Sequence, residues 1–289
     1  CFAALRRVGV SALLSLGVTS GVRADSVTLT PVEDTTISEK FSTQQGDTAE
    51  LTIGTNNKLQ SSRPLLRFDL ASNIPSNAVV TSAALSIQVY QMSPNFPSAV
   101  TFDLHKMASP WSGSGATWTV RLPSTPWSIN GAAAPTDFVS AVTQGISVFA
   151  GGTTNYTFAS NAGMVADVQD WVHSPTSNLG WIAISESQGV GGTESKFYSS
   201  EGTPAPSLVV QYTVPAAQPM LTLLSPAAGQ FRFSFNAESN RNYAVEYSGT
   251  LPATNWSVLT NIAPLPAPTN VSVSDPLTSS NRFYRVRTP

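Results

Sequence analysis

Residues 61–91 read SSRPLLRFDLASNIPSNAVVTSAALSIQVYQ, and this stretch decides the fold class. Its two apolar runs, 64–70 and 79–90, are separated by the proline-initiated turn sequence IPSNA. Apolar runs bounded by Pro, Asn and Ser are typical of β-strands. In the second run, every other residue belongs to a more apolar set that we predict to face a core: Val79, Thr81, Ala83, Leu85, Ile87 and Val89.

Comparable β-forming runs recur along the chain, at 26–30, 50–54, 100–107, 154–160, 179–187, 195–201 and 206–214. Polar loops rich in Gly, Pro, Asn and Ser separate them, which favours an antiparallel β-sandwich. Residues 162–172 break the period of two, because their apolar side chains recur at helical spacing. We therefore predict an all-β sandwich with one short helix over residues 25–213, and a long loop at 108–135.

The C-terminal part restarts the strand pattern after a Pro- and Ala-rich linker at 214–219. Six short runs follow within 220–289, a length typical of a small immunoglobulin-like or fibronectin-like β-sandwich. We expect its stability to come from the apolar side chains of these strands: Phe231, Phe233, Phe235, Tyr243, Val245 and Tyr247.

The first 24 residues have the pattern of a secretory signal peptide. Arg6 and Arg7 precede an apolar stretch, and Val22-Arg23-Ala24 resembles a cleavage site. We therefore expect a secreted protein, extracellular or at the cell surface. Cys1, the one cysteine of the sequence, lies inside this segment, so no disulfide is expected in the exported chain.

The charge pattern excludes some classes of partner. Only 11% of the residues are charged, with 15 basic against 17 acidic ones and no basic stripe, so nucleic acid is not an expected partner. After residue 24 no segment reaches the ~20 apolar residues that a membrane-spanning helix needs. The sequence does not indicate an oligomeric state.

Flat aromatic rings and a few oriented polar groups are the usual means of binding sugars outside the cell. Trp111, Trp118 and Trp127 lie in the predicted loop at 108–135, where they can form a sugar platform or anchor the loop. Trp171 and Trp181 are expected in the core. Candidate ligand-binding residues besides the loop tryptophans are Tyr198 and five cations that suit an acidic polysaccharide: Arg63, Arg67, Lys106, Arg121 and Lys196. For Arg67, a structural contact within the protein is the alternative.

A metal site is predicted in the stretch EDTTISEKFSTQQGDTAE, which we expect to be a loop. Asp34, Asp47 and Glu50 would supply carboxylate oxygens suited to structural calcium, although no EF-hand spacing is present.

Enzymatic mechanisms find little support in the sequence. His105 and His173 are the only histidines, and no G-x-S-x-G turn accompanies them. A polysaccharide lyase would need a base such as Tyr198 or His105 beside a cation such as Lys196 or Arg67. We predict no catalytic residues, with a small lyase as an alternative.

A set of motifs resembles the DNRLRE domain, which overlaps carbohydrate-binding module family 96. The likeness covers about residues 26–213, and the motifs that carry it are RPLLRFDL, IPSNA, SPW, DVQDW, NLGW and FYSSE. It implies a jelly-roll sandwich found in secreted, multi-modular bacterial proteins, some of which bind polysaccharides such as alginate. The resulting hypothesis is a secreted, non-catalytic polysaccharide-binding protein, and the main alternative is an extracellular structural or adhesion protein.

Overall fold

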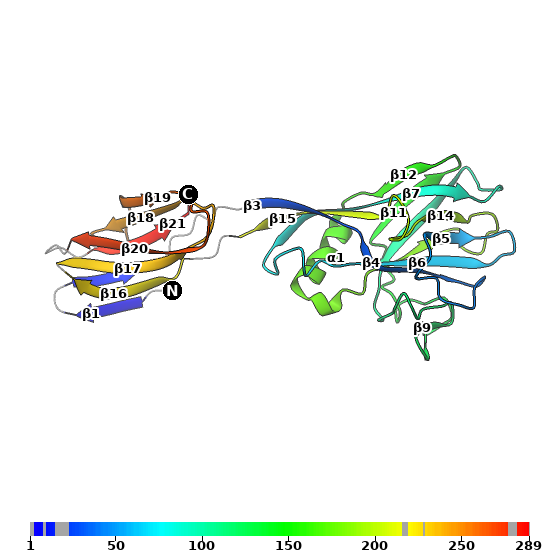
Figure 1. Cartoon of the computed structure of the whole chain (residues 1–289), viewed down its shortest axis with the longest axis horizontal. Coiled ribbons are helices and arrows are strands. Elements are labelled where there is room, and N and C mark those ends of the chain that lie inside the picture. Colours follow the sequence, from blue (N-terminus) through cyan, green and yellow to red (C-terminus); the bar gives the residue numbers. More distant parts are fainter. Residues whose placement is uncertain are drawn as a thin grey trace. The chain divides into compact units, whose positions relative to one another are not determined.

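The computed structural model describes residues 3–7, 10–14, 23–215, 219–227, 229–276 and 282–288, with side chains from residue 24 onward except at 225–227. The chain divides into two compact units (Figure 1). The large unit spans Ala24–Val214, and the small unit holds the described residues before and after it. No helix in the described part of the chain is long and apolar enough to cross a membrane.

The large unit is built almost entirely of antiparallel strands, which confirms the predicted β-sandwich. Its helical elements are α1 (Ala162–His173) and the 3-10 turn η1 (Pro175–Ser177). Its strands are β3 (Arg23–Leu29), β4 (Pro31–Ser38), β5 (Glu50–Thr55), β6 (Ser61–Phe68), β7 (Val79–Met92), β8 (Ala99–Lys106), β9 (Val120–Leu122), β10 (Thr125–Pro126), β11 (Gln144–Phe149), β12 (Thr154–Phe158), β13 (Trp181–Ser185), β14 (Ser195–Tyr198) and β15 (Ser207–Val214).

One curled sheet forms both layers of this unit. The strand order is β11-β8-β13-β6-β5-β14-β7-β15-β3, with β4 also paired to β6 and β12 to β7. β5 joins the layers, because its first four residues pair with β14 and its last two with β6. The turn between them is at Gly54, whose φ is +99° and where a Cβ atom would lie 2.3 Å from the Thr193 carbonyl oxygen.

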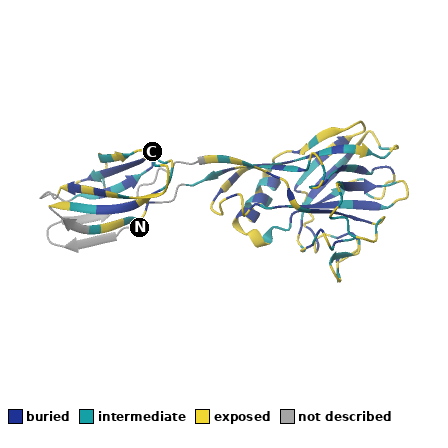
Figure 2. Ribbon diagram, in the orientation of Figure 1, coloured by how far each residue is buried: buried dark blue, intermediate teal, exposed yellow. Residues whose placement is uncertain are grey.

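The main core lies between the layers, where buried residues line the strands and α1 (Figure 2). On β7 the predicted core-facing set is confirmed from Ala83 to Val89. It is wrong for Val79 and Thr81, which are exposed. β15 pairs Gln211 with Ser82 but Tyr212 with Val80, so Thr81 is the extra residue of a β-bulge and Val80 turns inward.

The predicted helix is confirmed as α1. Asn161 caps it, because its side-chain oxygen accepts a hydrogen bond from the Met164 amide at 2.7 Å. Met164, Val168, Trp171 and Val172 are buried against the main core, so the helical period of apolar residues marks the packed face.

β4 lies where the sequence predicts a loop, and the structure corrects this. Its Pro, Glu and Asp residues are unusual in a strand, but Glu33–Ser38 pair in register with β6. Two buried hydroxyl groups of β4 have partners: the Thr36 hydroxyl accepts from the Thr52 amide, and the Ser38 hydroxyl lies 2.7 Å from that of Ser62. The Thr35 hydroxyl is buried without a partner among the described residues. The sequence pattern also does not predict β11, at Gln144–Phe149.

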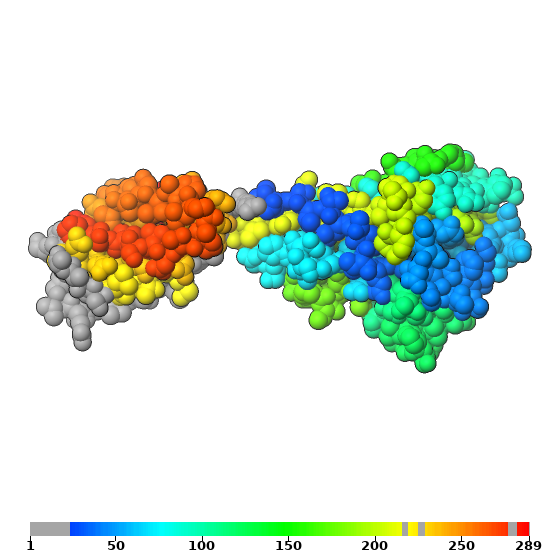
Figure 3. All heavy atoms as spheres, in the orientation of Figure 1, coloured from blue at the N-terminus to red at the C-terminus, as the bar shows by residue number. Residues whose placement is uncertain are grey.

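The segment from Met107 to Phe138 covers the outer face of the β4-β6-β13-β8 layer and forms a second core there. On β6, Leu66 faces the main core, whereas Leu65 faces this second core. The segment, which includes β9 and β10, stands out as the green lobe at the lower edge of the large unit in Figure 3. Its core consists of Ile37, Leu65, Met107, Trp111, Ala116, Trp127, Ala132, Phe138 and Ile182.

One charged side chain fixes this segment to the sheet, and another holds the segment together internally. Arg63 on β6 donates to the Gly131 and Ala132 carbonyls at 2.7 and 2.8 Å and to Gln188 at 2.9 Å. The buried Asp137 carboxylate accepts from the Ser128 and Ala133 amides.

The small unit has two sheets around one aromatic core. Its sheets are β1-β2-β21-β18-β19 and β16-β17-β20. Phe233, Phe235, Tyr243 and Val245 are buried between them, with Phe231 and Tyr247 partly buried, as predicted. The strands are β1 (Ala3–Arg7), β2 (Val10–Leu14), β16 (Leu221–Ala227), β17 (Gln230–Ala237), β18 (Tyr243–Ser248), β19 (Ser257–Ile262), β20 (Thr269–Pro276) and β21 (Phe283–Arg287). β1 and β2 lie in the predicted signal peptide, whose removal stays a prediction.

Replacing Arg63 should destabilise the large unit strongly. The R63M variant keeps the aliphatic stem but leaves two carbonyls and Gln188 without their charged donor, so the free energy of unfolding should fall by about 3 kcal/mol. R121M is the matched control, because Arg121 makes one exposed hydrogen bond, to the Pro110 carbonyl, and should cost no more than about 0.5 kcal/mol. Urea unfolding followed by tryptophan fluorescence checks both, and equal losses would contradict this role of Arg63.

Candidate functional site

The outer face of the other layer, on β5, β14 and β7, carries a cluster of polar and aromatic side chains. On β14, Ser195 and Phe197 are buried, whereas Lys196 and Tyr198 point outward and are partly exposed. In the register, Lys196 lies opposite Thr52 and Tyr198 opposite Glu50. The period of two therefore places Glu50, Lys196 and Tyr198 on the same face.

Two tyrosines stack at the centre of this cluster. The rings of Tyr90 on β7 and Tyr198 have centroids 4.5 Å apart and planes inclined by 22°. Glu50 connects them to the cation: its carboxylate accepts from the Tyr90 hydroxyl at 2.7 Å and from the Lys196 ammonium at 2.7 Å. We call Glu50, Tyr90, Lys196 and Tyr198 the tyrosine face.

The electrostatics of this face keep Glu50 ionised. Burial acts to raise the pKa of Glu50, but hydrogen bonds from Lys196 and Tyr90 and the charges of Lys196 and Lys40 outweigh it, so the pKa lies below its usual range. The effect of Lys40 shows that its ammonium is within electrostatic reach of the face. Lys40 is exposed and packs over the Phe41 ring at 4.8 Å. Lys40 is not among the cations that the sequence predicts for ligand binding.

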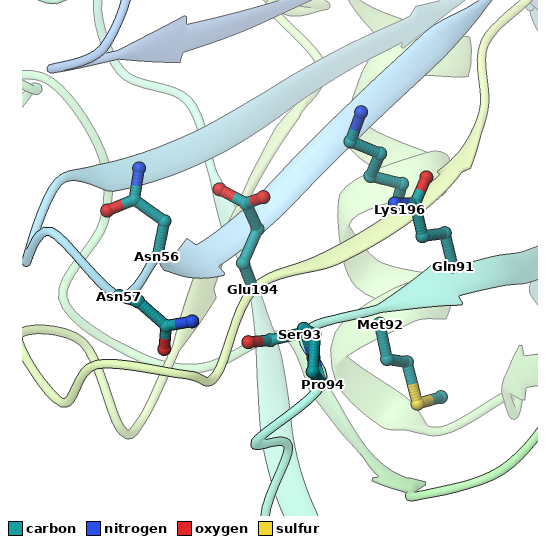
Figure 4. Close-up of a pocket in the computed structure, with 8 residues that line it drawn as sticks. All are labelled: Asn56, Asn57, Gln91, Met92, Ser93, Pro94, Glu194 and Lys196. Atoms are coloured by element: carbon teal, nitrogen blue, oxygen red, sulfur yellow. The ribbon is translucent and has the colours of Figure 1, made fainter.

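A small pocket adjoins the tyrosine face and shares Lys196 with it. Its volume is about 140 Å³, and we call it the asparagine pocket; its lining residues are Asn56, Asn57, Gln91, Met92, Ser93, Pro94, Glu194 and Lys196. The Glu194 side chain extends between Asn56 and Lys196 (Figure 4). Among the described residues, no group donates a hydrogen bond to its carboxylate. The pocket therefore combines amide groups with a free carboxylate.

Exposed apolar side chains lie on the loops beside this pocket. Leu59 and Val190 are 63% and 58% exposed. The loops that carry them touch, since a Cβ atom at Gly191 would lie 3.2 Å from Leu59 and 3.4 Å from the Asn56 carbonyl oxygen. A polar pocket with an apolar rim suits a ligand that has both hydroxyl groups and C–H surfaces.

Of the predicted ligand-binding residues, the structure brings together Lys196 and Tyr198. The tryptophan prediction is wrong for Trp111 and Trp127, because both rings are buried in the second core and leave no face for a sugar. Their indole nitrogens donate to the carbonyls of Leu179 and Thr117. The Trp118 ring is partly buried, with Arg63 stacked over it at 5.5 Å. These rings anchor the loop.

The other predicted cations are engaged within the protein and lie apart from the tyrosine face. Arg67 pairs with Glu33, the structural alternative considered for it. Lys106 joins β8 to α1 through Asp170 at 2.7 Å. Arg63 and Arg121 donate to carbonyls of the 107–138 segment.

The predicted calcium ligands are not brought together. Asp34 lies in strand β4 and Glu50 begins strand β5, so neither is on a loop, and only Asp47 is in an exposed turn. Glu50 already holds Lys196 and Tyr90. Within the described ranges, no three His, Cys, Asp or Glu side chains gather closely enough to hold a metal ion.

Two residues of the site, Tyr90 and Glu194, were not predicted as ligand-binding residues, and the sequence indicates their positions only in part. Tyr90 ends the outward set of the alternating run at 79–90, and an aromatic residue on an open strand face is a recognisable signal. Glu194 directly precedes the predicted strand at 195–201, but nothing in the sequence places it next to Asn56.

Asp34 should make the stability of the large unit depend on pH. One carboxylate oxygen accepts from the Ser200 amide at 2.8 Å, whereas Oδ1 is buried without a partner. Burial raises the pKa of Asp34 to about 6. Because the folded-state pKa is raised, protonation stabilises the fold, and this contribution is lost as the pH rises through about 6.

The D34N variant tests this assignment. Relative to D34N, the wild-type chain should lose about 3 kcal/mol of unfolding free energy between pH 4 and pH 7.5. Urea unfolding at both pH values measures the difference, and D47N in the exposed turn is the control. Parallel pH profiles for wild type and D34N would show that Asp34 does not titrate in this way.

Comparison with known families agrees with the resemblance found in the sequence. The family model of carbohydrate-binding module family 96 matches residues 25–135, whereas no curated protein matches the chain. The matched stretch runs from β3 through the 108–135 loop and includes Glu50 and Tyr90 of the tyrosine face. Lys196 and Tyr198 lie beyond it, and the resemblance over 136–213 stays a prediction. Residues 25–135 of the large unit are thus similar to carbohydrate-binding module family 96.

Proposed function

We propose that the large unit is a secreted, non-catalytic module that binds an extracellular polysaccharide through the tyrosine face and the asparagine pocket. The observation that carries this proposal is the stacked pair of Tyr90 and Tyr198, partly exposed and tied to Glu50 and Lys196, in a unit whose residues 25–135 resemble a carbohydrate-binding family. Aromatic rings cover the C–H side of a pyranose, and nearby polar groups orient its hydroxyls.

The hydrogen bonds within the site reduce the cost of binding. Ordering a mobile side chain on binding costs about 0.5–1.5 kcal/mol. Here Lys196 and Tyr90 are already held at 2.7 Å from Glu50, and Tyr198 is stacked on Tyr90. The site thus retains its geometry without the glycan.

The charges of the site allow an acidic polysaccharide at one end. At the tyrosine face, the Glu50 carboxylate is paired with Lys196, and the positive charge of Lys40 also acts on it. At the asparagine pocket, Glu194 adds a negative charge. A uronate residue would therefore bind near Lys40, and an uncharged sugar residue would occupy the pocket.

Truncating Tyr198 should weaken glycan binding without unfolding the unit. Y198A removes one ring of the stacked pair. Affinity for the polysaccharide should therefore fall about tenfold, which corresponds to the binding free energy of one aromatic contact. Q211A, an exposed position on β15 of the same layer, is the control. Affinity electrophoresis of residues 25–289 against alginate, pectin, ulvan, xylan and laminarin, with and without Ca²⁺, measures retention.

The same screen distinguishes the alternatives. Absorbance of unsaturated products would reveal a lyase and contradict the non-catalytic assignment. Equal retention of Y198A and Q211A would show that the polysaccharide binds outside the tyrosine face. No retention on any polymer would favour an extracellular structural or adhesion protein.

A further inference from the structure

The two stacked rings of the tyrosine face are also two oxidisable phenols in contact. Tyr90 and Tyr198 have ring centroids 4.5 Å apart, and both residues are partly exposed, so an oxidant in solution can reach them. The chain has seven tyrosines, and among the described residues no other two of them have their rings in contact. A phenol that loses one electron and its proton becomes a radical, and two such radicals held side by side can join.

The pairing of β7 with β14 fixes this contact. On β7, the pairing with β14 passes from Gln91 directly to Val89, so Tyr90 is the extra residue of a β-bulge. A bulge re-aims the side chain that it carries, and here that side chain is the ring that stacks on Tyr198. The contact is therefore built into the backbone of the layer.

The Glu50 carboxylate supplies the proton acceptor that oxidation of Tyr90 needs. A phenol becomes a strong acid when it loses an electron, so its proton must leave with the electron. The Tyr90 hydroxyl donates to Glu50 at 2.7 Å, and Lys196 and Lys40 keep that carboxylate ionised. A base positioned within hydrogen-bond reach accelerates such a proton transfer.

The other five tyrosines lack this combination of contact, exposure and base. Tyr212, Tyr243 and Tyr284 are buried, although the Tyr284 hydroxyl also donates to a carboxylate. The Tyr156 hydroxyl donates to a backbone carbonyl, and the Tyr247 ring packs under a guanidinium group. Oxidation should therefore be directed to the tyrosine face.

We propose that Tyr90 and Tyr198 are a modification site, at which a one-electron oxidant of the peroxidase type, driven by hydrogen peroxide, forms a dityrosine cross-link within the chain. Each ring gives up one electron and its phenolic proton, that of Tyr90 to Glu50 and that of Tyr198 to water. A carbon–carbon bond then forms between the ring carbons beside the two hydroxyls, and the hydrogen on each of these carbons is transferred to restore the hydroxyl. The chain loses two hydrogen atoms, and the peroxide is reduced to water.

This bond would join β7 to β14 covalently in the centre of the layer. The proposal does not rest on the proposed function, because the oxidation requires no polysaccharide.

Treatment of the full chain with peroxidase and hydrogen peroxide tests the cross-link. We expect dityrosine fluorescence in the single-chain band of a denaturing gel, a mass lower by two hydrogen atoms, and, after digestion, two peptides joined at Tyr90 and Tyr198. Y90F and Y198F keep both rings in place and should each remove the signal. Y156F is the matched control, since Tyr156 is also partly exposed, and should leave the signal unchanged.

The E50Q variant tests the proton acceptor separately, because a glutamine oxygen still accepts the Tyr90 hydrogen bond but does not take up the proton. The rate of cross-linking, measured relative to that of N-acetyltyrosinamide, should fall about tenfold in E50Q and increase with pH, whereas the wild-type rate should change little between about pH 5 and about pH 8. No dityrosine in the single-chain band, an undiminished yield in Y198F, joined peptides at other tyrosines, or equal pH profiles of E50Q and wild type would each overturn the proposal.

Discussion

Strand β6 is buried on both of its faces, and the arrangement of the large unit depends on this constraint. Leu66 packs into the core between the layers, and Leu65 packs under the 107–138 segment. A sheet layer covered on both sides cannot present a binding surface, which is why we place the proposed site on the outer face of the β5-β14-β7 layer. Arg63 holds the covering segment on the sheet, and Asp137 joins two parts of that segment to each other.

The low charge content of the chain explains why most of its cations do not serve a ligand. A buried or half-buried charge needs a partner, and three ion pairs of this unit each hold two elements together. Lys106 and Asp170 join β8 to α1, Arg67 and Glu33 join β6 to β4, and Lys196 and Glu50 join β14 to β5. Of these pairs, only the last lies beside two partly exposed tyrosine rings, and for this reason we place it in the proposed site.

The sequence predicts those features that depend on local periodicity. Strand β7 and helix α1 are predictable because their apolar residues recur every two residues or at helical spacing. Strand β4 is not predictable in this way, since the buried hydroxyls of Thr36 and Ser38 are satisfied by partners on β5 and β6 that only the fold brings close. The loop tryptophans were predicted as candidates for sugar binding, but Trp111 and Trp127 are buried because the 107–138 segment forms a core of its own. Lys196 and Tyr198 lie on one face because they are two residues apart on β14, but Tyr90 meets them only through the β7-β14 pairing.

Strand β14 has one more consequence, which concerns mechanical load. It carries both Lys196 and Tyr198, and it lies between β5 and β7, with antiparallel hydrogen-bond ladders on its two sides. A tensile force on a polymer held at these residues is therefore shared by two ladders loaded along the strand. Rupturing such ladders in shear requires several hydrogen bonds to break together. The proposed site is thus built on a strand whose two ladders would resist a pulling force on a bound polymer.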